Sequence, residues 1–350
     1  MPYTTVNDPS AHFQTTLWTG NASNRSITND GNSDIQPDWV WIKKRSAVQN
    51  HTMTDSSRGL GNILFPDVTD AESATQLVTS FDSDGFSLNT NALANDNSAT
   101  YVGWQWKCNG GTTTSFSASG AQLAGNRQTN ATAGLSIITY TGDGNNNATI
   151  PHGLSSPPKF VIIKERGNAT NWYVGHDFTF TTGEVFFNTN AALQAAFGPF
   201  NKTAPDASNI TLGTDGSVNG NNDTYVCYAF ADVQGYSKFG AYVGNGKSDG
   251  PYVHLGFQPA FVIIRRIANN DDWFMVDNTR EVSNPRGIKF TYVNQNAAEV
   301  TSDKDLDFLS HGFKCRTVTG FHNDPGNQYI YMAWAQHPFV TSTGVPSTAI

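Results

Sequence analysis

Charge, cysteine and long apolar runs are all scarce in this sequence. Asp, Glu, Lys and Arg make up only 14% of its 350 residues, whereas about a quarter is usual in globular proteins. No stretch comes near the roughly 18 consecutive apolar residues that a membrane-spanning helix requires. The first residues have neither the cationic region nor the apolar core of a signal peptide. We therefore expect neither membrane insertion nor a secretory signal.

The charges that are present are mostly acidic and scattered. The formal net charge is −8, and no basic stripe is visible that could follow a nucleic-acid backbone. The 3 cysteines, at positions 108, 227 and 315, form an odd and irregularly spaced set. We expect them to be small buried side chains in a reducing compartment. The sequence thus predicts no nucleic-acid partner.

Turn-forming and aromatic residues are abundant. Asn, Thr, Ser and Gly replace the missing charges, and glycine alone accounts for 32 residues. These residues favour turns and an uncharged surface that can form hydrogen bonds. Aromatic residues reach 12%, which argues against disorder because disordered chains contain few of them. The composition indicates a turn-rich β-protein.

A nine-residue phrase that starts with proline and leads into cationic residues occurs three times. The copies are Pro-Asp-Trp-Val-Trp-Ile-Lys-Lys-Arg at 37–45, Pro-Lys-Phe-Val-Ile-Ile-Lys-Glu-Arg at 158–166 and Pro-Ala-Phe-Val-Ile-Ile-Arg-Arg-Ile at 259–267. Proline cannot donate to a β-ladder, so it belongs at the start of a strand. The apolar run that follows it predicts a strand buried on both faces.

Other residues repeat at fixed distances from this phrase. An acidic or imidazole side chain stands eighteen residues after each proline: Asp55, His176 and Asp277. An alternating aromatic strand begins 64, 67 and 70 residues after it, at Tyr101, Tyr225 and Tyr329. Period-two alternation places Trp104 and Trp106 on one face of the first of these strands and Tyr101 on the other. Such a strand suits the interior of a sandwich.

These repeats predict an all-β fold of three tandem antiparallel β-sandwich units, jelly-roll-like, with few short helices. The expected units are 1–112, 113–233 and 234–350, the last with an extended C-terminal tail. A Gly/Ser/Thr/Asn-rich linker is expected at 109–132. The best candidates for short helices are 70–80 and 190–197. The tail from 336 onwards is expected either to fray or to dock on a partner.

Two Asp-x-x-Arg sequences invite a catalytic interpretation, because an aspartate beside an arginine can be a tuned carboxylate. They are Asp55 with Arg58 and Asp277 with Arg280. Their repetition in two units favours a structural role, since tandem duplication is more typical of structural devices than of catalytic sites. We expect each pair to be a salt bridge that pins a turn.

Three tryptophans are the candidates for sugar contacts, because aromatic rings can stack on carbohydrate. Trp172 and Trp273 hold equivalent positions four residues before His176 and Asp277, and Trp18 is likewise not assigned to a core strand. The alternative is that each caps the end of a sandwich. Glycan binding therefore rests on their exposure.

Catalytic, cofactor and metal motifs are lacking. The five glutamates do not recur at equivalent places, and no nucleophile elbow, phosphate-binding loop or paired metal ligands are visible. Two calcium-like loops, at 82–85 and 141–144, are better explained as hairpin turns. Aspartates could still supply the two carboxylates of a glycoside hydrolase. We therefore predict no catalytic residues, no cofactor and no metal, with a depolymerase as the weakest alternative.

Several phrases together resemble a repeat family of tailed-bacteriophage proteins, notably those of marine and cyanobacterial phages. They include Tyr-Thr-Gly-Asp-Gly at 140–144, the phrase at 158–166, Asn-Asp-Thr-Tyr-Val-Cys-Tyr-Ala-Phe-Ala at 222–231 and Phe-Val-Thr-Ser-Thr-Gly-Val-Pro at 339–346. The resemblance covers nearly the whole chain. It implies virion or tail-associated proteins with β-sandwich repeats and no catalytic residues to carry over.

The sequence and this resemblance together predict a non-enzymatic virion structural protein, such as a tail fibre, appendage or capsid decoration. It would assemble in the host cytoplasm and reside in the virion. Its partners would be other virion proteins and copies of itself. A lectin that binds host surface glycan is the main alternative.

Overall fold

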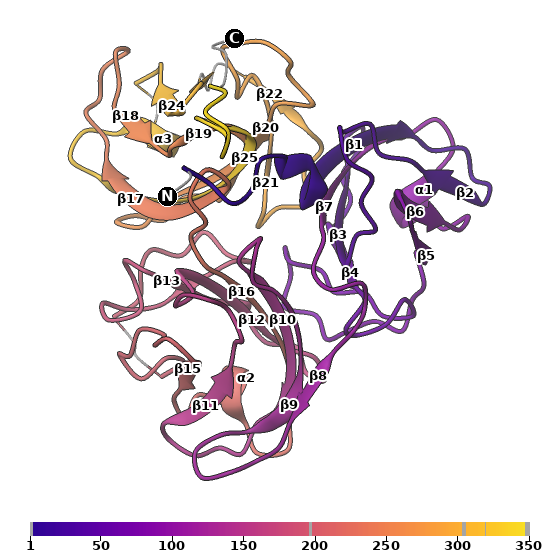
Figure 1. Cartoon of the computed structure of the whole chain (residues 1–350), viewed down its shortest axis with the longest axis vertical. Helices are drawn as coiled ribbons and strands as arrows, with labels where there is room; N and C mark the ends of the chain where they lie inside the picture. Colours follow the sequence, from indigo (N-terminus) through magenta and orange to yellow (C-terminus); the bar gives the residue numbers. More distant parts are fainter. Residues whose placement is uncertain (1–2, 196–197, 303–305, 319, 347–350) are drawn as a thin grey trace.

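The protein is built almost entirely of β-strands, arranged as three lobes around a common centre (Figure 1). The computed structural model describes residues 3–195, 198–302, 306–318 and 320–346. The all-β expectation is confirmed. We refer to the predicted segments 1–112, 113–233 and 234–350 as units one, two and three. Each contains a large sheet and a smaller one of two or three strands.

Unit one begins with a 3-10 turn, Pro9–Ala11. Its large sheet consists of β1 (Phe13–Thr19), β7 (Thr100–Trp106), β3 (Trp39–Lys44) and β4 (Thr52–Asp55). Its small sheet consists of β2 (Arg25–Ile27), β6 (Gly85–Leu88) and β5 (Val78–Asp82).

Unit two has a seven-stranded sheet, which consists of β14 (Val185–Phe186), β13 (Tyr173–His176), β12 (Phe160–Glu165), β16 (Thr224–Phe230), β10 (Leu135–Thr141), β9 (Ala124–Asn130) and β8 (Thr114–Phe116). Its small sheet pairs β11 (Ala148–Pro151) with β15 (Asn209–Leu212).

Unit three has a six-stranded sheet, which consists of β17 (Ser237–Val243), β25 (Gln328–Pro338), β19 (Phe257–Arg266), β20 (Phe274–Asp277), β21 (Lys289–Tyr292) and β22 (Val300–Thr301). Its small sheet consists of β18 (Tyr252–His254), β24 (Gly312–Cys315) and β23 (Leu306–Leu309).

The strand order of the large sheets recurs from unit to unit. It is β1-β7-β3-β4 in unit one, β10-β16-β12-β13 in unit two and β17-β25-β19-β20 in unit three. The repeated phrase supplies β3, β12 and β19, and each pairs antiparallel with the aromatic strand β7, β16 or β25. Every residue of β3 and β12 is buried, so the prediction of a strand buried on both faces is confirmed for these copies.

Alternate residues of the central strands enter different hydrophobic cores. In β7, Trp104 and Trp106 belong to a cluster that draws residues from all three units, whereas Tyr101 belongs to a cluster inside unit one. In β16, Tyr228 and Phe230 likewise face the shared cluster. The predicted alternation is therefore correct, but one face of each strand packs against the other units. The domain boundaries stay a prediction, because this core does not divide along them.

Among the described residues, the α-helices are three single turns in corresponding places: α1 (Ala92–Asn95), α2 (Gly216–Asn219) and α3 (Gly320–Asn323). In each unit, the tyrosine at the second position of the following strand forms hydrogen bonds with this turn. In unit one, Tyr101 Oη donates to the carbonyl oxygen of Ala92 at 2.9 Å and accepts from the amide of Asp96 at 2.8 Å. In the part of the chain that the structure describes, no helix has the length and apolarity needed to cross a membrane.

The helices predicted at 70–80 and 190–197 are wrong for the described residues. Residues 78–80 lie in β5, and 190–195 contain no helix, while 196 and 197 lie outside the described residues. In both segments a backbone amide instead donates a hydrogen bond to a neighbouring unit. Glu72 N donates to Arg166 O at 2.8 Å, and Leu193 N donates to Ile267 O at 2.9 Å. These extended contacts outweigh helix propensity.

The segment at 109–132 is not the linker that its composition suggested. It contains β8 and β9, and β9 pairs with β10 along seven residues, from Leu135↔Asn130 to Thr141↔Ala124. This hairpin extends the large sheet of unit two by two strands. A polar Gly/Ser/Thr/Asn composition suits a solvated edge hairpin as well as a linker.

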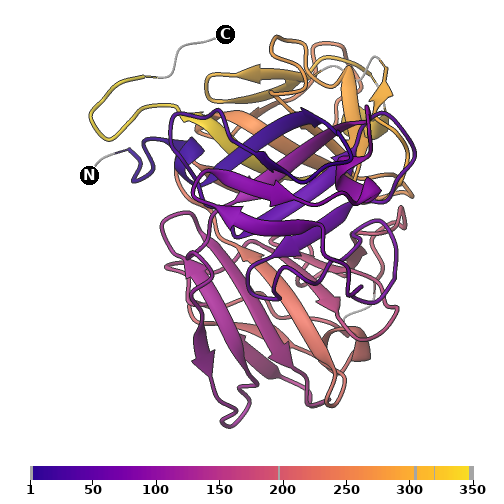
Figure 2. The same cartoon turned by 90° about the vertical axis from the view of Figure 1, so that its right-hand side faces the viewer.

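The two ends of the chain emerge on the same side of the molecule (Figure 2). The side chain of Asn7 bonds the hydroxyl and the amide of Ser342 at 2.8 and 2.7 Å. The ring of Phe339 packs edge-on against Tyr3, with 6.2 Å between the ring centroids. The described part of the tail therefore docks on the chain's own N-terminal segment, while residues 342–346 are exposed. Residues 347–350 lie outside the described residues.

Candidate functional site

The three tryptophans predicted as sugar contacts are buried. Trp18 is 7% exposed, and Trp172 and Trp273 are 0% exposed, so their rings cannot stack on a sugar. Trp18 stacks on Tyr101 inside unit one, with 5.5 Å between the centroids. The glycan contacts expected from these side chains are therefore wrong, because all three rings are committed to the interior.

Trp172 and Trp273 fasten each unit to the preceding one. The indole nitrogen of Trp172 donates to the carbonyl oxygen of Phe65 in unit one at 2.9 Å, and that of Trp273 donates to Phe186 in unit two at 2.8 Å. His51 fills the corresponding position in unit one. Burial lowers the pKa of His51 well below its usual value, although backbone carbonyls of unit three favour its protonated form. These positions are contacts between units.

Both Asp-x-x-Arg sequences form buried ion pairs. Arg58 Nε lies 2.6 Å from Asp55 Oδ2, and Arg280 Nε lies 2.6 Å from Asp277 Oδ2. The backbone amide of each arginine also donates to Oδ1 of its aspartate, at 2.9 and 2.8 Å. The two pairs thus close the turns that follow β4 and β20, in agreement with the structural role expected for them.

Each aspartate also receives a bond from the next unit around the centre. Tyr228 Oη of unit two donates to Asp55 Oδ2 at 2.6 Å, and Trp104 Nε1 of unit one donates to Asp277 Oδ2 at 3.2 Å. Both donors lie at the same place in the alternating aromatic strand. The ion pairs therefore join units as well as turns.

Glu72 extends the first ion pair across the boundary between units one and two. It accepts from Arg58 at 2.8 Å, and it accepts two bonds from Arg166 of unit two at 2.7 and 3.0 Å. Burial alone would raise the pKa of the Glu72 carboxyl, but the two guanidinium groups hold it below its usual value. A corresponding set joins units three and one and consists of Asp277, Arg280, Glu299 and Arg45. We call these two sets the ionic networks.

The boundary between units two and three has an uncharged set in place of an ionic network. The corresponding positions hold His176, Thr179, Leu193 and Ile267. The backbone bond from Leu193 N to Ile267 O matches the one from Glu72 N to Arg166 O. Burial lowers the pKa of His176 to about 4, so this side chain is neutral near neutral pH. The backbone contact is retained while the charges at these four positions are not. One buried cation does cross this boundary, because the Arg265 guanidinium donates to the carbonyl oxygen of Ala191. We call this boundary uncharged with respect to the four positions only.

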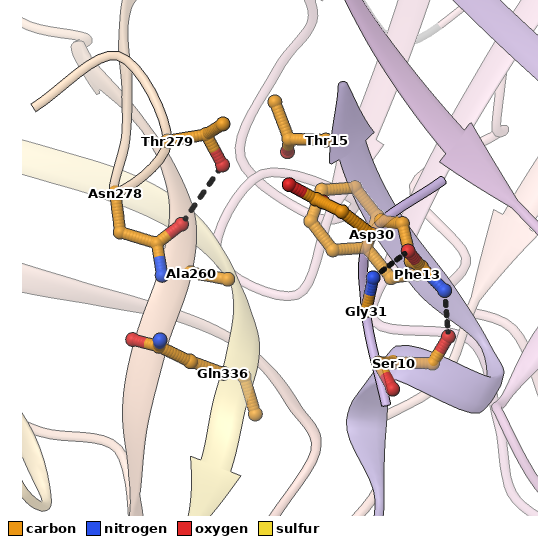
Figure 3. Close-up of a pocket in the computed structure, with 11 residues that line it drawn as sticks. Ser10, Phe13, Thr15, Asp30, Gly31, Ala260, Asn278, Thr279 and Gln336 are labelled. Atoms are coloured by element: carbon orange, nitrogen blue, oxygen red, sulfur yellow. Dashed lines mark hydrogen bonds between the residues drawn. The ribbon is translucent and has the colours of Figure 1, made fainter. Parts of the chain in front are cut away.

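A cleft opens between β1 of unit one and the end of β20 in unit three (Figure 3). It consists of an inner hollow of about 130 Å³ and an adjoining outer hollow of about 530 Å³. Figure 3 shows Asn278, Thr279 and Gln336 of unit three facing Phe13, Thr15 and Asp30 of unit one. β1 is the edge strand of its sheet. This cleft is the candidate functional site.

The cleft is lined by hydroxyl and amide groups and by one carboxylate, Asp30. No lysine, arginine or histidine is among its lining residues. Thr15 is 8% exposed, and its Oγ1 has no hydrogen-bond partner; Gln336 Oε1 also has none. A buried polar atom without a partner costs about 1–3 kcal/mol. Both atoms belong to residues that line the cleft, but they are shielded from solvent by the side chains around them.

The described surface offers little for hydrolysis or metal binding. Four surface clefts formed by described residues each contain a single acidic side chain, which is Asp30, Asp38 or Asp232. Burial, with Asp215 nearby, raises the pKa of Glu184 to about 7, yet neither residue lines these clefts. No three His, Cys, Asp or Glu side chains among the described residues could hold a metal ion.

Sequence reasoning missed the cleft because its residues are not distinctive by type. Asn278 and Thr279 directly follow Asp277, so their fixed place in the repeat was the available signal. Asp30 lies in the Asn/Ser-rich stretch 21–34, which connects β1 to β3 through β2. The glutamates of the ionic networks had a signal as well, namely the arginines at the end of the repeated phrase.

Comparison with known proteins places the chain in a family but leaves its activity open. No curated protein and no solved structure matches it. The family described as "Domain of unknown function (DUF7483)" matches residues 8–338. This match spans all three units, both ionic networks and the cleft. The chain belongs to this family.

Proposed function

We propose that this chain is a non-enzymatic structural protein of a bacteriophage particle, part of a tail fibre, another appendage or a capsid decoration. The observation that supports this best is the core that all three units share. Removing one unit would expose large aromatic side chains of the other two to water, which is unfavourable. The three units therefore form one body, as a structural part of a particle requires.

The joined chain ends support the same proposal. The N-terminal segment bonds both the C-terminal arm, through Asn7 and Ser342, and the connection between units two and three, through Thr4 and Gln234. The phage-like phrases of the sequence point in the same direction. A depolymerase is less favoured, because none of the four clefts holds two carboxylates among its described residues.

The test is to find the chain in particles of the phage that encodes it. Mass spectrometry of purified particles should detect the protein at a fixed ratio to the capsid protein, and gold-labelled antibody should mark one site on each particle. Light scattering of the purified chain should show association with itself or with another virion protein. Particles that lack the chain after purification would overturn the proposal.

A further inference from the structure

We propose that the cleft between units one and three binds a neutral oligosaccharide. This goes beyond the structural role, and the two can fail separately. The cleft combines a size suited to a small ligand with unsatisfied polar atoms and an absence of cations in its lining. Small-molecule sites in proteins commonly measure about 300–1,000 Å³, and the two hollows together fall in that range.

At the boundary between units one and two, a side chain of the protein itself bonds the residues that correspond to Asn278 and Thr279 of the cleft. Ser56 and Ser57 follow Asp55 as Asn278 and Thr279 follow Asp277. Gln128 of β9 donates from its amide to both serine hydroxyls, at 2.8 and 3.0 Å. The chain thus supplies its own polar partner at that boundary.

Unit one has no counterpart of β9, and neither has unit three, in which β17 is also an edge strand. β9 covers the edge of β10, whereas β1, which holds the corresponding position in unit one, has no strand on its outer edge. On the opposite side of the cleft, the Thr279 hydroxyl donates to the side-chain oxygen of its neighbour Asn278, at 3.4 Å. A ligand with hydroxyl groups could bond these side chains as Gln128 bonds the serines.

The chemistry of the lining selects the class of ligand. Phosphate, sulfate and uronate need cationic partners, and the lining provides none while it presents the carboxylate of Asp30. Amides and hydroxyls match the donors and acceptors of uncharged sugars. The outer hollow also presents Leu17 and the 78% exposed Val282, which can contact the C–H face of a sugar ring. A neutral oligosaccharide satisfies both requirements.

The test uses the full chain and a defined set of probes. Hexasaccharides of glucose, mannose, galactose and N-acetylglucosamine are titrated by calorimetry, with a hexasaccharide of mannuronic acid as the charged comparison. We expect at least one neutral probe to bind at millimolar concentration or below, and the charged probe to bind more weakly. Failure of every neutral probe, or tighter binding of the mannuronate, would overturn the proposal.

Two variants locate the binding, and a third controls for the substitution itself. Thr15→Val removes the unpartnered hydroxyl at nearly constant shape and should weaken binding about tenfold, which equals about 1.4 kcal/mol. Asn278→Leu should do the same from unit three. Thr139→Val, on the covered strand β10, should leave binding unchanged. Unaltered affinity in both cleft variants would refute the site. A rise in Tm of Thr15→Val without any sugar binding would show that the hydroxyl is simply an unsatisfied buried group, and it would refute the site as well.

Discussion

The two ionic boundaries and the uncharged boundary join their units at corresponding positions, but with different residues. Between units one and two, Asp55, Arg58 and Glu72 meet Arg166 in a buried network. Between units two and three, all four positions change together, and the strand donor Tyr228 is replaced by Met332 as well. The backbone bond is the same in both. The comparison shows that these residues act as a set, since a lone buried charge would be costly.

The largest effect should follow from breaking an ionic network while leaving its carboxylates in place. Arg58→Met leaves Asp55 and Glu72 buried without their shared cation and should lower the free energy of unfolding by about 3–5 kcal/mol. Thr179→Val, at the corresponding place of the uncharged boundary, removes the hydroxyl that accepts from His176 N at 3.1 Å and should cost less, about 1–3 kcal/mol. Urea unfolding followed by fluorescence measures both. Equal effects of the two variants would contradict the contrast between the boundaries.

The pH dependence of stability should come partly from Asp67, which stands where units two and three have Asn188 and Asn294. Each accepts from the backbone amide four residues before the acidic or imidazole position, and for Asp67 this donor is His51 N at 3.2 Å. Burial raises the pKa of Asp67 to about 7 from a normal value of 3.8, and its Oδ2 has no partner. Folding therefore favours the protonated carboxyl.

Asp67 therefore makes the free energy of unfolding fall as the pH rises. The stabilisation is present below about pH 4 and is lost as the pH rises to about 7, by about 4 kcal/mol. Asp67→Asn copies the other units, so it should flatten this decline and make the protein more stable than wild type at pH 7. Chemical unfolding at several pH values measures the difference between the two proteins. A variant that parallels wild type from pH 4 to 7 would show that Asp67 does not titrate in this range.

A smaller loss of stability is expected when the hydrogen bonds that the two indole groups donate across unit boundaries are removed. Trp172→Phe and Trp273→Phe each delete one N–H donor to a buried carbonyl and a part of the ring, and should cost about 1–3 kcal/mol. Because one bond crosses an ionic boundary and the other the uncharged one, similar costs would show that these contacts work independently of charge. Thermal unfolding measures both. A much larger cost for Trp273 would mean that the uncharged boundary depends more on its indole.

The smallest effect should come from converting one boundary into the other. The combined variant carries Asp55→His, Arg58→Thr, Glu72→Leu, Arg166→Ile and Tyr228→Met. Buried ion networks can often be replaced by apolar groups at little cost, so its stability should lie within about 1 kcal/mol of wild type, far above Arg58→Met. The same unfolding assay applies. If the combined variant were less stable than the single one, the residues would not act as a set.

Local features could be predicted from the sequence because they depend on residues close to one another. The phrase strands, the alternation of Trp104 with Tyr101 and the two Asp–Arg pairs depend on spacing alone. The shared core could not be predicted, since both faces of an aromatic strand look equally apolar in one dimension. Trp172 was misjudged for a related reason, because its partner at Phe65 lies 107 residues away. The cleft lies beside an uncovered edge strand and between two units, and neither feature leaves a motif in the sequence.

The meeting of the chain ends through Asn7 and Ser342 has a practical consequence for engineering. A short peptide could join the ends, and new ends could be opened in the exposed loops of any unit, giving circular permutants with the same core. The whole body could equally be inserted into a surface loop of a host protein, because Asn7 and Ser342, near the two attachment points, lie side by side. A chain folded as a closed ring of three units is suited to such modular use.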